Sequence, residues 1–142
     1  MVARCNPRTD PARLDIDVIH TFLSEESYWS KGIPRDVVER AIAHSLCFGM
    51  YKDGAQVGFA RVVSDHATFA LLADVFVLDG HRGKGLSKWL MQVVVAHPDL
   101  QGLRRLLLLT SDAHELYRKF GFTEIGNAWR FMEVLRPDIY ER

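Results

Sequence analysis

The chain has 142 residues, of which 48% are hydrophobic and 25% are charged, a balance typical of one folded domain rather than a disordered segment. Eighteen basic residues offset eighteen acidic ones, so the composition disfavours a protein that binds nucleic acid mainly through phosphate contacts. Cys5 and Cys47 form no Cys-x-x-Cys pair, which gives no support to a zinc site or a disulfide framework.

The first third of the chain is predicted to form mainly helices. Residues 2–6 are compatible with a short strand, and Asp10 is placed to cap a helix that begins near Pro11. Apolar residues recur at helical spacing over residues 14–23 and give this helix one apolar face. A loop follows, and Pro34 then begins a second helix.

The middle of the chain has strand patterns. Residues 46–51 and 56–63 flank an Asp53-Gly54 pair, which is a strong signal for a hairpin turn. Residues 69–78 are almost wholly apolar, as expected of a strand that is covered on both faces. This run is too short to cross a membrane, and charged residues interrupt the N-terminus where a signal peptide would be apolar.

The last third alternates between the two kinds of element. The predicted elements are a helix that starts at Leu86, a strand over residues 106–109, a helix capped by Asp112, and closing strands at residues 123–125 and 130–134. This order indicates an α+β or mixed α/β sheet with helices on both faces. We therefore expect a single cytoplasmic domain over the whole chain, with no nucleic acid, membrane or metal partner.

The most informative stretch is residues 75–87, where a buried strand enters a glycine-bearing turn that opens into an amphipathic helix. The first amides of a helix lack partners within it and the helix dipole makes that end partly positive, which suits a phosphate or pyrophosphate. Gly83 and Gly85 permit close approach and positive φ, while Arg82 and Lys84 add positive charge. On this pattern alone, a flexible turn with solvated charges is an equal alternative.

Two better-known phosphate motifs do not fit this loop. A P-loop counted from Gly80 requires lysine directly after Gly85, where Leu86 stands. A dinucleotide fingerprint counted from Gly83 requires its third glycine where Lys88 stands.

Two motifs, in this order along the chain, resemble the GNAT superfamily of N-acetyltransferases. Their acetyl-CoA motif, Arg/Gln-x-x-Gly-x-Gly/Ala, is matched by Arg82, Gly85 and Ser87, with serine where glycine or alanine is usual. Residues 113–122 are similar to the family's late helix, Ala-x-x-Leu-Tyr-x-x-x-Gly-Phe, although Thr110 stands where an asparagine is usual. Together with the order of strands and helices, the resemblance covers nearly the whole chain.

The resemblance implies one N-acetyltransferase domain over residues 1–142, with a mostly antiparallel twisted sheet, a splayed central strand and helices on both faces. It implies transfer of an acetyl group from acetyl-CoA to a primary amine by direct attack in a ternary complex. The main chain of the central strand would pair with the pantetheine arm, and the loop amides would hold the pyrophosphate. The cofactor-binding residues expected on this basis are Phe76, Val77, Arg82, Gly83, Lys84, Gly85, Leu86 and Ser87.

Two catalytic residues are expected, the first from the resemblance and the second from its place in the sequence. In the family a tyrosine at the position of Tyr117 lies near the cofactor sulfur and protonates the departing thiolate, and a phenol with a reference pKa of about 10 carries its proton at neutral pH. The alternative is a tyrosine that only packs beside Leu116 and Phe120. Asp74 is the candidate base because a charge inside an apolar strand needs a partner or a purpose. Its alternative is an ion pair with Arg61.

Acceptor binding is expected in the region between the first two helices. Glu25, Tyr28 and Trp29 combine acidic and aromatic groups, which suit a cationic amine through charge pairing and cation–π contact. A surface loop pinned by a buried Trp29 is an equal alternative. The second function considered is a regulatory module that holds acyl-CoA without turnover. The sequence leaves open the amine, the acyl group and the choice between monomer and homodimer.

Overall fold

A four-stranded sheet in the order β1-β2-β3-β4 runs through the computed structural model, which describes residues 11–141. β1 (Leu46–Lys52), β2 (Ala55–Ser64) and β3 (Phe69–Val77) form an antiparallel meander, and β4 (Arg105–Leu108) pairs parallel to β3. The hairpin predicted between the first two strands is confirmed. Both residues of its Asp53-Gly54 turn have positive φ, 52° and 82°, as the turns that match the twist of a hairpin require.

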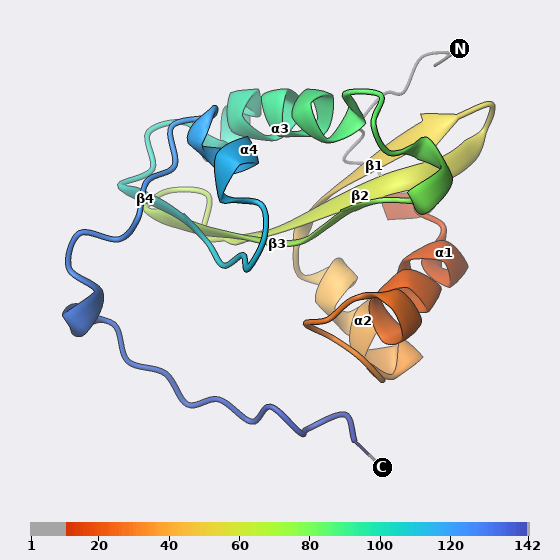
Figure 1. Cartoon of the computed structure of the whole chain (residues 1–142), viewed down its shortest axis with the longest axis horizontal. Coiled ribbons are helices and arrows are strands. Elements are labelled where there is room, and N and C mark those ends of the chain that lie inside the picture. Colours follow the sequence, from red (N-terminus) through yellow and green to blue (C-terminus); the bar gives the residue numbers. More distant parts are fainter. Residues whose placement is uncertain (1–10, 142) are drawn as a thin grey trace.

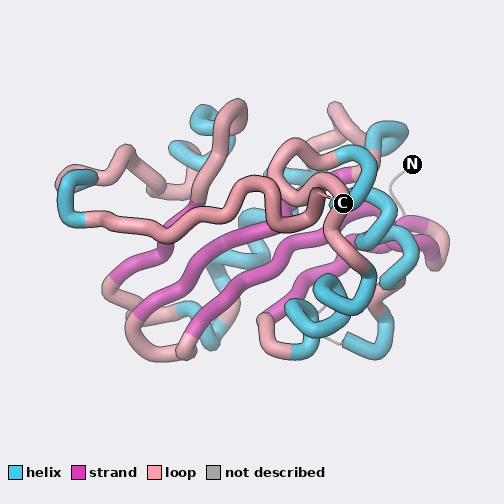
Figure 2. The backbone as a smooth tube through the Cα atoms, turned by 90° about the horizontal axis from the view of Figure 1, so that it is seen from below, coloured by secondary structure: helices cyan, strands magenta, loops and turns pink. Residues whose placement is uncertain are grey.

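Helices cover both faces of this sheet (Figure 1). α1 (Ile16–Thr21) and α2 (Arg35–Ala43) lie below it in that view, α3 (Leu86–Ala96) lies above it, and α4 (His114–Arg118) follows β4. Seen from below in Figure 2, the strands lie side by side and the C-terminal segment crosses in front of them. The short helical turns are Pro11–Arg13, Phe22–Glu26, Asp79–His81, Pro98–Leu100 and Ala128–Arg130.

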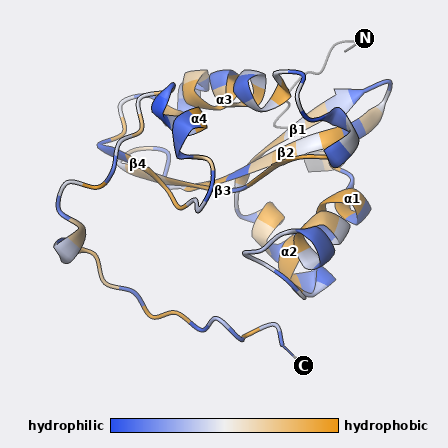
Figure 3. Ribbon diagram, viewed as in Figure 1, coloured by the Kyte–Doolittle hydropathy of each residue, from blue (hydrophilic) through white to orange (hydrophobic). Residues whose placement is uncertain are grey.

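The helices bury their apolar sides against the sheet, where Figure 3 shows the hydrophobic residues gathered. Above the sheet, Leu90 and Met91 of α3 pack on Phe48 of β1, and all three are fully buried. Below the sheet, Ile19 and Phe22 belong to a second buried cluster with residues of β2 and β3. No helix in the described part of the chain is both long and apolar enough to cross a membrane.

Two predicted helix caps are corrected. Asp15 caps α1, because its Oδ1 accepts a hydrogen bond from the amide of Val18; Asp10, the predicted cap, lies outside the described residues, as does the predicted strand at residues 2–6. Asp112 does not cap α4. The N-cap residue of α4 is Ala113 and no described side chain caps the helix, although Oγ1 of Thr110 accepts from the amide of Ala113 at 3.1 Å in the preceding turn.

The closing strands predicted at residues 123–125 and 130–134 are absent from the structure. These residues follow an extended course that pairs with no other described strand. Their sequence suits a strand, but a strand forms only where backbone hydrogen bonds to another strand are made, and from residue 131 on the chain runs away from β4 (Figure 1).

Candidate active site

A cleft opens where β4 separates from β3. The two parallel strands pair only from Phe69 to Leu72 on β3, opposite Arg105 to Leu108 on β4. Beyond this point β3 continues to Val77 with no partner on that side among residues 11–141. The space beside the diverging strands contains a cavity of about 530 Å³. The splayed central strand expected from the sequence is therefore present.

The edge of β3 that faces this opening has free main-chain groups. The amide of Leu78 donates to the carbonyl of Val57 at 2.8 Å. The alternation of an antiparallel ladder then turns the main chain of Phe76 toward β2 and that of Val77 away from it. The ring of Phe76 is buried in the lower core. Of the two β3 residues predicted to bind the cofactor, Val77 thus has its amide on the open side.

The loop at residues 79–87 joins β3 to α3 and contains two glycines in the left-handed region. Gly83 and Gly85 have φ of 77° and 76°, which glycine adopts without strain. A Cβ added at either position would meet nothing within 4 Å, so open space lies beside both residues. No side chain caps the first turn of α3 in the described chain, and its leading amides have no partner within the helix.

Arg82 braces this loop against the end of β3. Its Nε donates to the carbonyl of Val77 at 2.9 Å, and its Nη1 donates to Oδ1 of Asp79 at 3.1 Å. The amide of Arg82 is also used within the loop, since it donates to the carbonyl of Asp79. The ring Nδ1 of His81 is buried and has no hydrogen-bond partner among the residues that the structure describes. The open amides therefore begin at Gly83.

Asp74 lies in the cleft with an unusual backbone conformation. Its φ is 52°, beside a shift of register between β2 and β3, and such strain is concentrated at functional sites. Its Oδ2 accepts from Nε of Arg61 at 2.7 Å, and its Oδ1 accepts from Nε1 of Trp29 at 2.8 Å. The ion pair with Arg61, one of the two sequence interpretations, is present, and Arg61 also donates to Oγ of Ser45.

The loop at residues 27–32 is held over the cleft at two points. Oη of Tyr28 accepts from the amide of Ser111, which follows β4, at 3.1 Å. Nε1 of Trp29 donates to Oδ1 of Asp74 on β3. The start of the loop is fixed by Ser27, whose buried hydroxyl donates to a main-chain carbonyl. Tyr28 and Trp29 consequently line the cavity, and their role in acceptor binding stays a prediction.

Glu25 is not brought to the cleft. The helical turn Phe22–Glu26 continues α1, so Glu25 lies on a helix and is exposed rather than in the loop that lines the cavity. The predicted end of the first helix was too early. The apolar pattern ends at Leu23, whereas the helical backbone continues for one wider turn, to Glu26. No pattern in the sequence indicated the contact made by Ser111. Its main-chain amide donates to Oη of Tyr28, and a main-chain contact has no side-chain pattern that could predict it.

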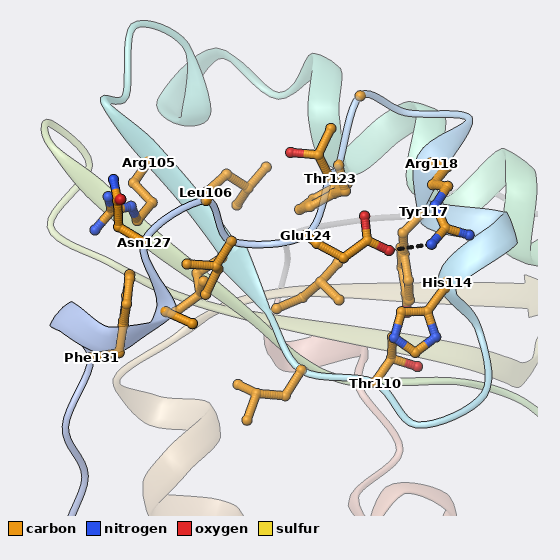
Figure 4. A pocket seen from close by; sticks show the side chains of 18 of the residues that line it. Arg105, Leu106, Thr110, His114, Tyr117, Arg118, Thr123, Glu124, Asn127 and Phe131 are labelled. Atoms are coloured by element: carbon orange, nitrogen blue, oxygen red, sulfur yellow. Dashed lines mark hydrogen bonds and ion pairs between the residues drawn. The ribbon is translucent and has the colours of Figure 1, made fainter.

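Tyr117 on α4 lines the same cleft. It is buried, its ring packs edge-on against Phe122 with centroids 5.8 Å apart, and it also borders a larger hollow of about 970 Å³ on the outer side of β4 (Figure 4). Burial, with smaller contributions from Tyr28 and Asp112, raises the pKa of the phenol to about 12. The hydroxyl therefore keeps its proton at neutral pH, as a proton donor must.

Comparison with known proteins identifies the family. Residues 43–124 match the family model described as an acetyltransferase (GNAT) domain. A curated protein of Gibberella zeae, provisionally named an acetyltransferase, is 35% identical, with 78% of this chain and 74% of that protein covered. The chain belongs to the GNAT acetyltransferase family.

Solved structures agree with this GNAT assignment. A GNAT-family protein from Xanthomonas campestris pv. campestris is 54% identical, with both chains wholly covered and a TM-score of 0.96. A GNAT acetyltransferase from Elizabethkingia anophelis, solved with acetyl-CoA bound, is 14% identical, with 84% of this chain and 75% of that chain covered and a TM-score of 0.61. The latter likeness shows the fold alone. The mixed four-stranded sheet with flanking helices is thus the GNAT fold predicted from the sequence.

Cys47 is poorly suited to act as a nucleophile in this GNAT domain. It lies on β1 in the lower core, and its thiol faces the main-chain carbonyls of Ile42 and Ser45. Burial raises the pKa of the thiol to about 12. The thiolate, which is the reactive form, is therefore scarce at neutral pH.

We expect the variant Cys47→Ala to keep kcat within about twofold of wild type, because a buried thiol with a raised pKa is poorly suited to carry an acyl group. The measurement is the steady-state release of CoA thiol with an amine that the wild type accepts. A loss of about 100-fold with unchanged acetyl-CoA affinity would instead indicate a covalent route.

Proposed function

We propose that this chain is an acetyl-CoA-dependent N-acetyltransferase that transfers the acetyl group to a primary amine by direct attack in a ternary complex. One observation carries the proposal. The cleft that Asp74, Trp29 and Tyr117 line borders β3, and the same strand continues past its open edge at Val77 into the loop at residues 79–87. The loop and strand edge suit the donor, and the cleft suits the acceptor.

The residues present fit the donor. The amides of Gly83, Lys84, Gly85, Leu86 and Ser87 are proposed to hold the pyrophosphate, and open space beside the two glycines leaves room for it. The buried, unsatisfied nitrogen of His81 supports a polar ligand at this loop. Arg82 is proposed to act by bracing the loop, since its guanidinium is already engaged. The open edge of β3 at Val77 is proposed to pair with the pantetheine arm.

Bound acetyl-CoA would supply a thioester that an amine can attack. The outward amide of Val77 is the proposed donor of a hydrogen bond to the carbonyl oxygen as negative charge develops there. Tyr117 is proposed to give its proton to the leaving sulfur, because it borders the cleft and its pKa of about 12 keeps the phenol protonated.

The amine is proposed to bind beside Asp74, Tyr28 and Trp29. The aromatic rings offer cation–π contact to an ammonium group, and Asp74 offers negative charge. Each oxygen of Asp74 already accepts one hydrogen bond, but a carboxylate has about four acceptor positions. Asp74 therefore has acceptor positions left for a hydrogen bond from the amine without releasing Arg61 or Trp29.

The variant Asp74→Asn should lower kcat/KM at pH 7 by about 100-fold if Asp74 accepts the proton of the amine. The loss should shrink as the pH approaches the amine pKa of about 10.4, because the amine then arrives without its extra proton. The measurement is the pH profile of kcat/KM for both proteins. An equal loss at every pH would mean that Asp74 only positions Trp29 and Arg61.

The first test is calorimetric titration of the purified protein with acetyl-CoA, beside acetyl-pantetheine, which lacks the pyrophosphate. We expect micromolar affinity for acetyl-CoA and a much weaker affinity for the truncated donor. Amine-dependent release of CoA thiol then establishes transfer. Binding without thiol release across a broad amine panel would favour a regulatory acyl-CoA module, and no binding at millimolar acetyl-CoA would overturn the proposal.

A further inference from the structure

The guanidinium of Arg61 on β2 borders the cleft and is only partly engaged. Its Nε donates to Oδ2 of Asp74 at 2.7 Å, and its Nη1 donates to Oγ of Ser45 at 3.2 Å. Its Nη2 has no hydrogen-bond partner among the described residues. This nitrogen is not sealed from solvent, since the one buried and unsatisfied side-chain polar atom of residues 11–141 belongs to His81. One edge of the guanidinium is therefore available to a ligand.

Asp74 offers the opposite charge directly beside this edge. Its two oxygens accept one hydrogen bond each, from Trp29 and Arg61, whereas a carboxylate has about four acceptor positions. The side chains of Arg61 and Asp74 are only 20% and 10% exposed, so water screens them weakly. The cleft thus contains a cation and an anion in direct contact, and each has hydrogen-bonding capacity left.

The charges of this pair determine which small molecule suits the cleft. A ligand with an ammonium group alone is attracted by Asp74 but repelled by the adjacent Arg61, whereas a zwitterion is attracted by both. Because Nε of Arg61 and Oδ2 of Asp74 are 2.7 Å apart, the two charges of a ligand that contacts both must also lie close together. An α-amino acid, in which one carbon carries both charged groups, meets this requirement.

Most of the other side chains that line the cleft are apolar or aromatic. Leu71, Val75 and Leu109 line it together with Trp29, and Asp112 is the one further charged residue of the described chain that does so. Walls of this kind bind an apolar group by removing it from water. The cavity of about 530 Å³ has the size of a site for a small molecule.

We propose that the acetyl acceptor is an α-amino acid with an apolar side chain, with its carboxylate held by Arg61 and its amino group by Asp74. This inference rests on the proposed function and names the substrate class of that site. It makes Arg61 a specificity-determining residue. The amino group is then held at β3, the strand whose open edge at Val77 is proposed to bind the thioester.

The transfer balances with these groups. The ammonium first releases one proton to solvent through Asp74. The C–N bond then forms as the C–S bond breaks, and the second proton that nitrogen loses replaces the proton that Tyr117 gives to the sulfur. The products are an N-acetyl amino acid and CoA thiol.

Calorimetric titration in the presence of CoA tests the proposal without turnover. The ligands are leucine and phenylalanine, their amides, and ε-aminohexanoate, in which a long chain separates the two charges. We expect each acid to bind at least about 10-fold more tightly than its amide, because only the acid forms a charge-assisted bond with Arg61. ε-Aminohexanoate should bind no better than the amides. Equal or tighter binding of the amides to the wild type would overturn the proposal.

The variant Arg61→Gln separates carboxylate binding from a structural role. Glutamine can still donate to Asp74 but leaves its charge unbalanced, so the preference should invert: the acid should bind about 10-fold more weakly than in the wild type, and the cationic amide more tightly. A residue that only positions Asp74 would weaken acid and amide equally, which would contradict the assignment. Arg40→Gln, at an exposed position of α2 outside the cleft, should keep the wild-type preference.

Release of CoA thiol from acetyl-CoA distinguishes this proposal from the proposed function. Amino acids should give a kcat/KM at pH 7 about 10-fold or more above that of their amides. The lower amine pKa of an amide, about 8, gives it more free base at this pH, so the preference cannot come from amine protonation. Turnover of amides or simple amines at equal or higher kcat/KM would overturn the amino-acid proposal and leave the transferase standing. No turnover of any amine would instead contradict the proposed function, while calorimetry would still measure the preference for the acid.

Discussion

The variant Gly85→Trp is expected to lower the affinity for acetyl-CoA by at least about 100-fold, equivalent to about 2.7 kcal/mol. Gly85 has φ of 76°, stands directly before α3, and would direct any side chain into open space. An indole in that space would occupy the position proposed for the pyrophosphate, next to the free amides of the first helical turn. Calorimetric titration measures the loss.

The control for this variant is Gly102→Trp. Gly102 has φ of 74° and equally open surroundings, so both variants carry the same backbone strain and the same added ring. Gly102 differs in lying outside the proposed donor site, in the turn before β4. A milder substitution, Gly85→Asn, should bind nearly as well as wild type, because asparagine tolerates positive φ and is small. Equal affinity of Gly85→Trp and Gly102→Trp would contradict the assignment of the loop as the donor site.

The variant Tyr117→Phe should reduce kcat by about 100-fold while leaving the affinity for acetyl-CoA near that of the wild type. The phenyl ring keeps the edge-on contact with Phe122 and the packing on the upper core, so only the proposed proton donor is removed. Tyr140→Phe is the matched control and should leave kcat unchanged, since it removes a phenol hydroxyl from a side chain that packs on the lower core and does not line the cleft. An unaltered rate for Tyr117→Phe would remove Tyr117 from the mechanism.

The raised pKa of Tyr117 also determines the alkaline side of the pH–rate profile. Below its pKa of about 12 the phenol is protonated and able to donate. Raising the pH from 7 deprotonates the amine first, since its pKa is about 10.4. We therefore expect the wild-type rate to rise with pH to a plateau and to show no decline below about pH 11. A phenol with the unshifted pKa of about 10 would already have lost its proton at that pH, and the rate would decline.

Elements that depend on local pattern were predicted well. α2 and α3 follow from apolar residues at helical spacing, and the Asp53-Gly54 hairpin follows from turn chemistry alone. The loop at residues 79–87 was also recognisable, because an anion site at a helix start needs only glycines and a preceding strand, which are adjacent in sequence.

Features that depend on distant partners were not predictable in the same way. The left-handed backbone at Asp74 arises from the register shift between β2 and β3, which no local pattern encodes. The predicted cap Asp112 is not used, because the turn after β4 makes Ala113 the N-cap residue of α4 and brings the hydroxyl of Thr110 to its amide. The closing strands were predicted from a sequence suited to pairing, yet residues 130–134 pair with no strand of the described chain.

The position of the cleft between two layers of helices has a consequence for the order of events. The loop at residues 79–87 lies on the α3 side of the sheet, whereas the loop that carries Tyr28 and Trp29 connects helices on the opposite side (Figure 1). In the proposed reaction the donor and the amine therefore enter through different faces of one sheet and meet beside β3. Neither has to leave before the other arrives, so both orders of binding lead to the same productive complex.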